Sequence, residues 1–278
     1  MLIIGRKYRF TKFEKQRLKK LNHRITVIRY RNRPPEEVLE ELKSLLNNKN
    51  FTTVVVNTKV KVDDEIIKYL TNLQFEENIN ITTIENFMET YLQKCYIPEN
   101  DKDLNYLSEI KPFTNWQYIQ KRIIDYLGVF SLFVLVLPAL IYARYKIKKE
   151  SPGTSMFKQL RVGFKNKEFY CIKFRSMRLD AEKEGAQFAS ENDPRVFPWG
   201  EFMRKTRIDE LPQLINVLKG EMHFIGPRPE RRHWINEFEK IIPYYNERHL
   251  VRPGITGWAQ VMYPYGANAD DAKQKLMY

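Results

Sequence analysis

Two adjacent carboxylates, Asp209 and Glu210, follow closely after Arg204, Lys205 and Arg207. A carboxylate can attack phosphorus or hold a metal ion, and neighbouring cations neutralise phosphate oxygens. This combination is typical of a site that handles a phosphorylated substrate. The structural alternative is that Asp209 only caps a helix. The residue types of this stretch leave both interpretations open.

A helix is predicted directly after the acidic pair. Apolar residues recur there at helical spacing, at Leu211, Leu214, Ile215 and Leu218. Pro212 is tolerated only in a first helical turn, so we expect the helix to begin near Asp209. Lys219 and Gly220 are typical of its end. The pair would then lie at a helix N-terminus, where free N–H groups and the helix dipole favour anions.

Further basic residues lie in stiff segments on either side. Pro227 and Pro229 fix the backbone around Arg228, whose planar guanidinium suits phosphate recognition. Residues 157–162 and 169–174 predict a β-hairpin around a turn with Gly and Asn. Arg161, Lys173 and Arg175 of this hairpin are candidates to line an anion site, and a turn predicted over 192–195 carries Arg195. A solvated basic face and an ordinary rigid loop are the structural alternatives.

An apolar stretch over residues 127–143 carries no charge and has basic flanks. At about 1.5 Å per residue, it barely crosses a bilayer core of about 30 Å. Pro138 interrupts the stretch and favours a kink, and basic flanks favour the cytoplasmic side for both ends. We therefore expect residues 116–150 to form a re-entrant helix that dips into one leaflet. A straight single span and a buried core helix are the alternatives.

The chain before this helix predicts a separate domain. Residues 1–24 are strongly basic and sparse in apolar positions, which predicts a solvated arm that an acidic membrane surface would attract. Residues 25–99 follow a β-α-β-α-β pattern, typical of a small parallel sheet with helices. Gly5 is the only glycine before Gly128, so the glycine-rich dinucleotide turn is missing. We expect a reduced Rossmann-like domain with a regulatory or scaffolding role, and a linker over 100–115.

Composition limits the partners. Charged residues make up 29% of the chain and the mean hydropathy is −0.53, which excludes a protein with many membrane spans. The net charge of +13 favours anionic partners such as phosphorylated small molecules, acidic lipids or nucleic acid. Nucleic acid is disfavoured, because the basic groups surround an acidic pair and a membrane helix. Cys95, Cys171 and the four histidines form no metal-binding pattern.

Together these segments resemble the bacterial sugar transferase family, the monotopic phosphoglycosyl transferases. The resemblance covers residues 115–278 and depends on motifs in the family's order, among them KFRSM, DPRV, RKTRIDELPQLINVLKGEM, GPRPE and VRPGITGWAQV. It implies an α+β, membrane-associated catalytic domain over 151–278, anchored by a re-entrant helix that is kinked at Pro138. The α/β domain before it resembles, more loosely, the N-terminal domain of larger members.

The resemblance also implies an activity. The family transfers a sugar 1-phosphate from a UDP-sugar to polyprenyl (undecaprenyl) phosphate and releases UMP, as the first membrane step of exopolysaccharide, capsule or lipopolysaccharide synthesis. Asp209 would form a covalent phosphosugar enzyme, and Glu210 would hold Mg²⁺. The implied substrate-binding positions are Lys173, Arg175, Arg195, Arg204, Pro227, Arg228 and Pro229. The enzyme would lie among phospholipids on the cytoplasmic face of the bacterial inner membrane, and a monomer and a homodimer are both open.

The chain departs from the family at several positions. Leu137 stands before the helix-breaking proline, where many relatives have serine, and His223 stands where small polar residues are common. We expect His223 to affect donor preference, and the end at Tyr278 to reflect a truncated C-terminus. The competing interpretation is an inactive or non-enzymatic membrane scaffold for glycan assembly. A glycosidase is disfavoured, because its two carboxylates must flank the bond from opposite sides.

Overall fold

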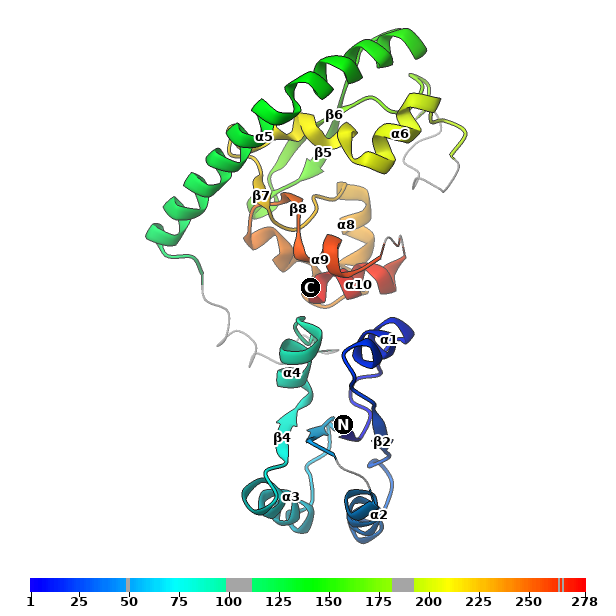
Figure 1. Cartoon of the computed structure of the whole chain (residues 1–278), viewed down its shortest axis with the longest axis vertical. Coiled ribbons are helices and arrows are strands. Elements are labelled where there is room, and N and C mark those ends of the chain that lie inside the picture. The colour runs from blue at the N-terminus through cyan, green and yellow to red at the C-terminus, as the bar shows by residue number, and fades with distance from the viewer. Residues whose placement is uncertain (49–50, 99–111, 182–192, 265, 267) are drawn as a thin grey trace. The chain divides into compact units, whose positions relative to one another are not determined.

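The computed structural model describes residues 1–48, 51–98, 112–181, 193–264, 266 and 268–278. The chain divides into two compact units, Met1–Tyr96 and Ile97–Tyr278, and each is described by itself (Figure 1). Most of the predicted linker over 100–115 falls outside the described residues.

The first unit contains a parallel sheet with the strand order β2-β1-β3-β4. Its strands are short and rich in β-branched residues, as expected for a sheet covered by helices. They are β1 (Leu2–Ile4), β2 (Thr26–Ile28), β3 (Thr53–Val56) and β4 (Asn80–Thr83). All three residues of β1 are fully buried. The prediction of a solvated arm over residues 1–24 is therefore wrong for its first residues, which form an inner strand.

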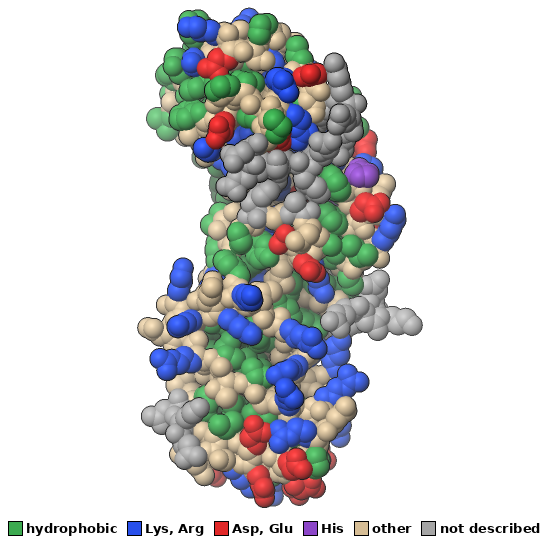
Figure 2. Space-filling view, turned by 90° about the vertical axis from the view of Figure 1, so that its right-hand side faces the viewer, with side chains coloured by type: hydrophobic (Ala, Val, Ile, Leu, Met, Phe, Trp, Pro, Cys, Tyr) green, Lys and Arg blue, Asp and Glu red, His purple; other side chains and the backbone are tan. Residues whose placement is uncertain are grey.

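Helices cover this sheet. They are α1 (Lys12–Lys20), α2 (Pro35–Asn48), α3 (Asp64–Glu76) and α4 (Ile84–Phe87), followed by the π-helical turn η1 (Met88–Leu92). The two helices of the predicted β-α-β-α-β pattern are confirmed as α2 and α3, and Asp63 caps α3 through its side chain. The basic residues of α1 remain at the surface. Lysine and arginine side chains gather on the face of the first unit in the lower half of Figure 2, with Asp and Glu side chains below them.

A buried ion pair links α1 to the end of the first unit. Lys94 and Glu14 are fully buried and bound to each other, and the Tyr8 hydroxyl donates to Glu14 Oε1 at 2.7 Å. Lys94 Nζ also donates to the Tyr8 hydroxyl, at 3.1 Å. Glu14 further closes the capping box of α1, because its Oε2 accepts from the backbone N–H of Thr11 at 2.7 Å. Burial lowers the pKa of Lys94 to about 7.

The second unit combines a long helix with two small sheets. The helices are α5 (Asn115–Glu150), α6 (Pro198–Thr206), α7 (Leu214–Leu218), α8 (Arg232–Phe238), α9 (Trp258–Met262) and α10 (Ala269–Met277). Single 3-10 turns are η3 (Phe164–Asn166), η4 (Ile208–Gln213) and η5 (Tyr245–Leu250). The strands are β5 (Met156–Val162), β6 (Glu168–Phe174), β7 (His223–Ile225) and β8 (Gly254–Thr256). The antiparallel β5-β6 pair confirms the predicted hairpin, and β7 pairs with β8 in parallel.

Helix α5 runs along one side of the second unit (Figure 1). Val129 joins a core with β6 and α7, and Ile147 joins a core with β6 and α6. Between these contacts the helix exposes large apolar side chains, among them Phe130, Phe133, Val134, Leu135 and Ile141. By length and composition α5 is apolar enough to cross a membrane. It continues through Pro138 to Glu150 as one element, and its re-entrant course stays a prediction.

Candidate active site

Three segments of the second unit converge on the acidic pair. Lys173 extends from β6, Asp209 and Glu210 lie on η4, and Arg228 lies in the loop after β7. The fully buried side chain of Asn216 on α7 fixes this packing. Its amide accepts from one backbone N–H of β6 at 3.0 Å and donates to one carbonyl of β6 at 2.8 Å. The hairpin and η4 are thereby held against each other.

The acidic pair lies on a 3-10 turn and not in the predicted α-helix. The turn η4 ends at Gln213, and α-helical structure begins only at Leu214. Such turns are frequent at helix N-termini. Arg207, with a φ of 62°, takes the position before η4, and no side chain caps the turn. The capping role considered for Asp209 is therefore wrong, whereas the predicted end near Gly220 is confirmed by its φ of 79°.

Glu210 is surrounded by cations. Arg228 binds it with both guanidinium nitrogens, at 3.1 Å to Oε2 and 2.6 Å to Oε1. Lys173 Nζ lies 3.3 Å from Oε1, and Arg207 Nη1 lies 3.7 Å from the same oxygen. Burial disfavours the charge of Glu210, but the ammonium of Lys173 and the hydrogen bonds from Arg228 outweigh burial and hold its pKa well below the usual range. Glu210 is therefore an anion in this site.

Asp209 has the opposite environment. It is 8% exposed, and its Oδ1 is buried with no hydrogen-bond partner among the described residues. Burial raises the pKa of Asp209 above its ordinary value, although the charges of Lys173, Arg204 and Arg207 oppose this rise. A carboxylate oxygen without a structural partner is available to a ligand or to a phosphorus atom.

A narrow pocket lies next to Lys173 and Arg228, the two side chains that bind Glu210. It is lined by Arg161, Cys171, Lys173, Gln213, Arg228 and Pro229. Arg161 and Lys173, two of the three hairpin candidates for an anion site, line this pocket and Arg175 does not; anion binding there stays a prediction. No local sequence pattern singled out Gln213. Burial raises the pKa of the Cys171 thiol, so this cysteine stays protonated and is a poor competing nucleophile.

The Pro-Arg-Pro loop is held from both sides. Arg161 Nη1 donates to the carbonyl of Pro229 at 3.1 Å, and Arg248 Nη2 donates to the carbonyl of Arg228 at 2.6 Å. The carbonyl of Pro227 accepts from the first backbone N–H of β8 at 2.9 Å. At Gly226 an added Cβ would lie 2.5 Å from a backbone oxygen, so the close approach of the two segments requires glycine. These contacts present the Arg228 guanidinium in one fixed direction.

Other predicted site residues lie elsewhere. Arg195 binds Asp193 with two nitrogens, at 2.8 and 2.6 Å, and this contact lowers the pKa of Asp193 to about 2. His223 is 5% exposed, and its ring is bound to the buried carboxylate of Asp125 on α5. The backbone N–H of Phe224 donates to the same carboxylate at 2.9 Å. The structure therefore places His223 in an anchor between β7 and α5.

Arg175 follows β6, and its side chain binds the turn after α5. Its Nε donates to the carbonyl of Thr154 at 2.7 Å, and its Nη atoms bind the Ser151 hydroxyl at 2.6 Å and the Pro152 carbonyl at 3.2 Å. Arg175 is only 4% exposed. These contacts occupy its donors with the chain itself, which favours a structural role over the substrate contact implied by the resemblance.

Replacing Arg175 with Met is expected to lower the free energy of unfolding by about 2–3 kcal/mol, because buried acceptors lose a charged donor. Urea unfolding of the purified protein measures this change. Arg175→Lys should recover little, since a single ammonium cannot replace the planar fork. A variant that unfolds like the wild type but loses affinity for a nucleotide would instead establish the substrate contact.

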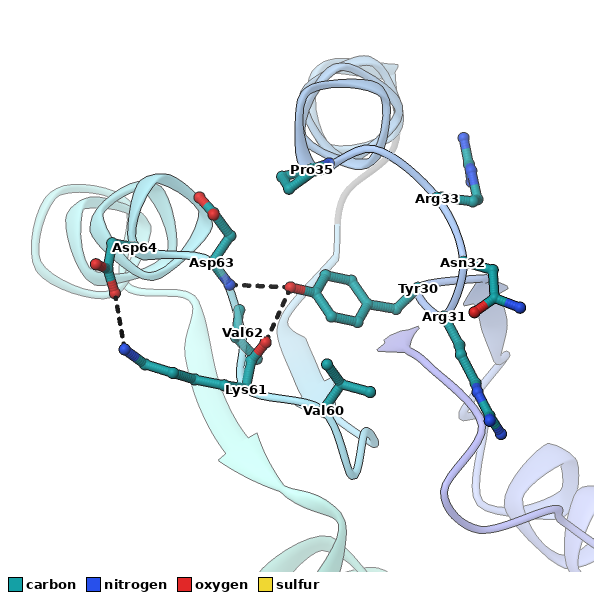
Figure 3. A pocket seen from close by; sticks show the side chains of 10 residues that line it. All are labelled: Tyr30, Arg31, Asn32, Arg33, Pro35, Val60, Lys61, Val62, Asp63 and Asp64. Atoms are coloured by element: carbon teal, nitrogen blue, oxygen red, sulfur yellow. Dashed lines mark hydrogen bonds and ion pairs between the residues drawn. The ribbon is translucent and has the colours of Figure 1, made fainter.

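The first unit has a cavity of its own, of about 420 Å³, between the loops after β2 and β3. Figure 3 shows the Tyr30 ring pointing between these loops, with its hydroxyl bonded to the backbone of Asp63 at 2.9 Å and of Lys61 at 3.3 Å. Arg33 points away toward α2, where it pairs with Glu41. The regulatory or scaffolding role of this unit stays a prediction.

Comparison with known proteins decides the family. A family model described as bacterial sugar transferase matches residues 116–278, which include the whole site. The chain belongs to this family. The exopolysaccharide production protein PSS of Rhizobium leguminosarum bv. phaseoli is 38% identical over 161 residues, 56% of this chain and 80% of that relative.

Longer members of the family are also similar to this chain. The UDP-N-acetylgalactosamine-undecaprenyl-phosphate N-acetylgalactosaminephosphotransferase of Aeromonas hydrophila is 48% identical over 172 residues, 62% of this chain. The UDP-glucose:undecaprenyl-phosphate glucose-1-phosphate transferase of Escherichia coli (strain K12) is 39% identical over 150 residues, 54% of this chain. The matched parts span only 40% and 32% of these two relatives.

Proposed function

We propose that this protein transfers a sugar 1-phosphate from a UDP-sugar to undecaprenyl phosphate. The observation that carries the proposal is the unpartnered, buried Oδ1 of Asp209 beside a cluster of fixed cations. The names of the relatives supply the donor and acceptor classes, and one of those names refers to exopolysaccharide production.

The reaction takes place in two displacements. Asp209 Oδ1 attacks the sugar-linked phosphorus, and the bond from that phosphorus to the bridging oxygen breaks. UMP leaves with the electron pair, and a phosphosugar remains on Asp209. An oxygen of the acceptor phosphate then attacks the same phosphorus and displaces the carboxylate. A covalent intermediate divides one difficult displacement into two easier ones.

Charge stabilisation comes from the cations around the pair. Phosphoryl transfer depends mainly on positioning and on neutralising charge at the phosphate oxygens. Lys173 and Arg228 are held in place through Glu210, and Arg204 and Arg207 act on the charge of Asp209. These groups would bind the donor diphosphate and orient its phosphorus toward Asp209.

We also propose Mg²⁺ as the metal at this site. The described residues contain no cluster of three or more His, Cys, Asp or Glu side chains. One or two carboxylates nevertheless suffice for Mg²⁺ when substrate phosphates and water complete its coordination. Glu210 would hold the ion, and its Oε1 would then be shared between the ion and Arg228. The Oδ1 of the adjacent Asp209, which has no hydrogen-bond partner among the described residues, is a second candidate ligand. Bound there, the ion would shield the diphosphate from the approaching carboxylate.

The contacts of α5 support a monotopic arrangement on the cytoplasmic face of the membrane. Arg122 donates to a carbonyl of α7 at 3.3 Å, and Ile147 packs against α6 and β6. These positions lie about 38 Å apart along the helix. A single span would separate its ends by a hydrocarbon core of about 30 Å, yet both ends contact the same folded unit. We therefore favour a helix held in one leaflet, with its exposed apolar side chains in lipid.

The test is UMP release by the protein in nanodiscs, with undecaprenyl phosphate, Mg²⁺ and a panel of UDP-sugars. We expect acceptor-dependent release with at least one donor, which names the sugar. Chelation by EDTA should abolish release and added Mg²⁺ should restore it, because the donor diphosphate is otherwise unshielded. No release with any donor, from folded and membrane-bound protein, would favour an inactive scaffold for glycan assembly.

A further inference from the structure

A buried amide in the cation pocket has no partner in the site as it stands. Gln213 is 2% exposed, and its Nε2 has no hydrogen-bond partner among the described residues. The same side chain lines the pocket with Arg161, Lys173 and Arg228. A buried N–H without an acceptor costs free energy, so its persistence needs an explanation.

The charges around this amide point to the missing acceptor. Three cations line the pocket, and the carboxylates paired with them are Glu210 and Glu230. Cations attract the oxygen of an amide and repel its N–H groups. The buried N–H of Gln213, a residue that lines this pocket, is therefore favourable only when an anion enters and accepts from the amide and the cations together.

We infer that Gln213 Nε2 donates a hydrogen bond to a non-bridging oxygen of the phosphoryl group that Asp209 takes up. Gln213 follows Asp209 by four residues within the same 3-10 segment, η4. The two side chains complement each other, because Asp209 Oδ1 lacks a hydrogen-bond donor and Gln213 Nε2 lacks an acceptor among the described residues. The identity of the phosphoryl group depends on the proposed function, whereas anion binding by the pocket does not.

The role of this donor differs from that of the cations. Lys173 and Arg228 each bind Glu210, so their charge is shared between the protein and a phosphate. A neutral amide binds an oxygen without a competing carboxylate and fixes the direction of the phosphoryl group. The expected contribution is orientation as well as affinity, and it applies to the donor before the acceptor arrives.

The experiment measures binding of inorganic phosphate and of UDP to the full chain in nanodiscs by calorimetry. Gln213→Met removes the donor at similar volume, and Gln213→Glu places a carboxylate among the cations. We expect affinity to fall about 5- to 30-fold in the first and at least about 100-fold in the second. The matched controls are Gln260→Met and Gln260→Glu, since Gln260 is an exposed glutamine of the same unit.

Several outcomes would overturn the inference. Unchanged phosphate and UDP affinity in folded Gln213→Met would exclude the amide from the anion site, and so would a wild type that binds neither probe. An equal loss in the Gln260 variants would also contradict it. A third arm measures the burst of UMP without acceptor. If Gln213→Met keeps this burst and raises only the KM of undecaprenyl phosphate, the amide serves the acceptor and the assignment to the donor is wrong.

These measurements separate the inference from the proposed function. Phosphate and UDP binding need no turnover, so they test the pocket even if no UDP-sugar is a substrate. The pocket could bind both probes through Gln213 in a protein that shows no transferase activity. This outcome would contradict the proposed reaction and support the anion site.

Discussion

Asp209→Asn is expected to reduce acceptor-dependent UMP release on the order of 10⁴-fold or more, the scale seen when a covalent nucleophile is removed. An amide keeps the size of the side chain but is a poor nucleophile toward phosphorus. Its Oδ1 forms no hydrogen bond in the described structure, so the substitution breaks no structural contact there. Intact-protein mass spectrometry after incubation with donor alone should show a phosphosugar adduct on the wild type and none on the variant.

Stability controls make this result interpretable. Asp209→Asn should melt at the wild-type temperature or above it, because burying an unpartnered carboxylate is unfavourable. Asp180→Asn changes an exposed carboxylate of the same unit and should leave release unchanged. A folded Asp209→Asn protein that retains more than about a tenth of the activity would exclude this residue as the nucleophile, and the adduct would then have to be sought on another side chain.

The largest expected effect on stability lies in the first unit. Lys94→Met should lower the free energy of unfolding by about 3–5 kcal/mol, because it leaves the carboxylate of Glu14 buried without its cation. Glu14→Gln should be costly for the converse reason. The double variant should recover most of the loss, since removing both charges also removes their desolvation penalty. Urea unfolding of the four proteins forms a double-mutant cycle, and additive losses would contradict a direct pair.

The pH dependence of Glu14→Gln follows from the lysine. Burial lowers the pKa of Lys94 from 10.5 to about 7, and in this variant no carboxylate opposes the effect. Between those pH values the unfolded chain binds more protons than the folded one, so the free energy of unfolding rises with pH. The free energy of unfolding of Glu14→Gln should therefore be higher at pH 9 than at pH 6. A free energy of unfolding that does not rise between pH 6 and pH 9 would show that Lys94 stays charged without its partner.

Local patterns in the sequence predicted the parts of the site that depend on neighbours in the chain. The β5-β6 hairpin, the acidic pair and the proline-flanked Arg228 are each visible within a few residues. The structure adds what local patterns cannot contain, namely that Lys173 and Arg228 meet at Glu210 from different elements. Family resemblance supplied their roles in advance, but not this geometry.

The errors have physical causes. Strand β1 has three residues, too few for a period to appear, and only pairing with both neighbours identifies it. The spacing of apolar residues after Asp209 is compatible with a 3-10 turn that leads into a helix, so it did not locate the boundary. The site roles expected for Arg175 and His223 stay predictions, and their structural partners, the turn after α5 and Asp125, are too distant in the sequence for a local pattern to show. No local sequence pattern singles out Gln213, because its proposed role follows from a buried N–H that has no acceptor in the described structure.

The double attachment of α5 to one folded unit bears on how such a protein would enter a bilayer. Arg122 and Ile147 each contact the second unit from opposite ends of the apolar stretch. If α5 lies in one leaflet, as proposed, it can insert from the side on which the chain is made, because neither flank then has to be translocated. The basic residues at both ends would then remain in the aqueous phase. Membrane insertion would require only that the apolar surface of α5 partitions into the lipid.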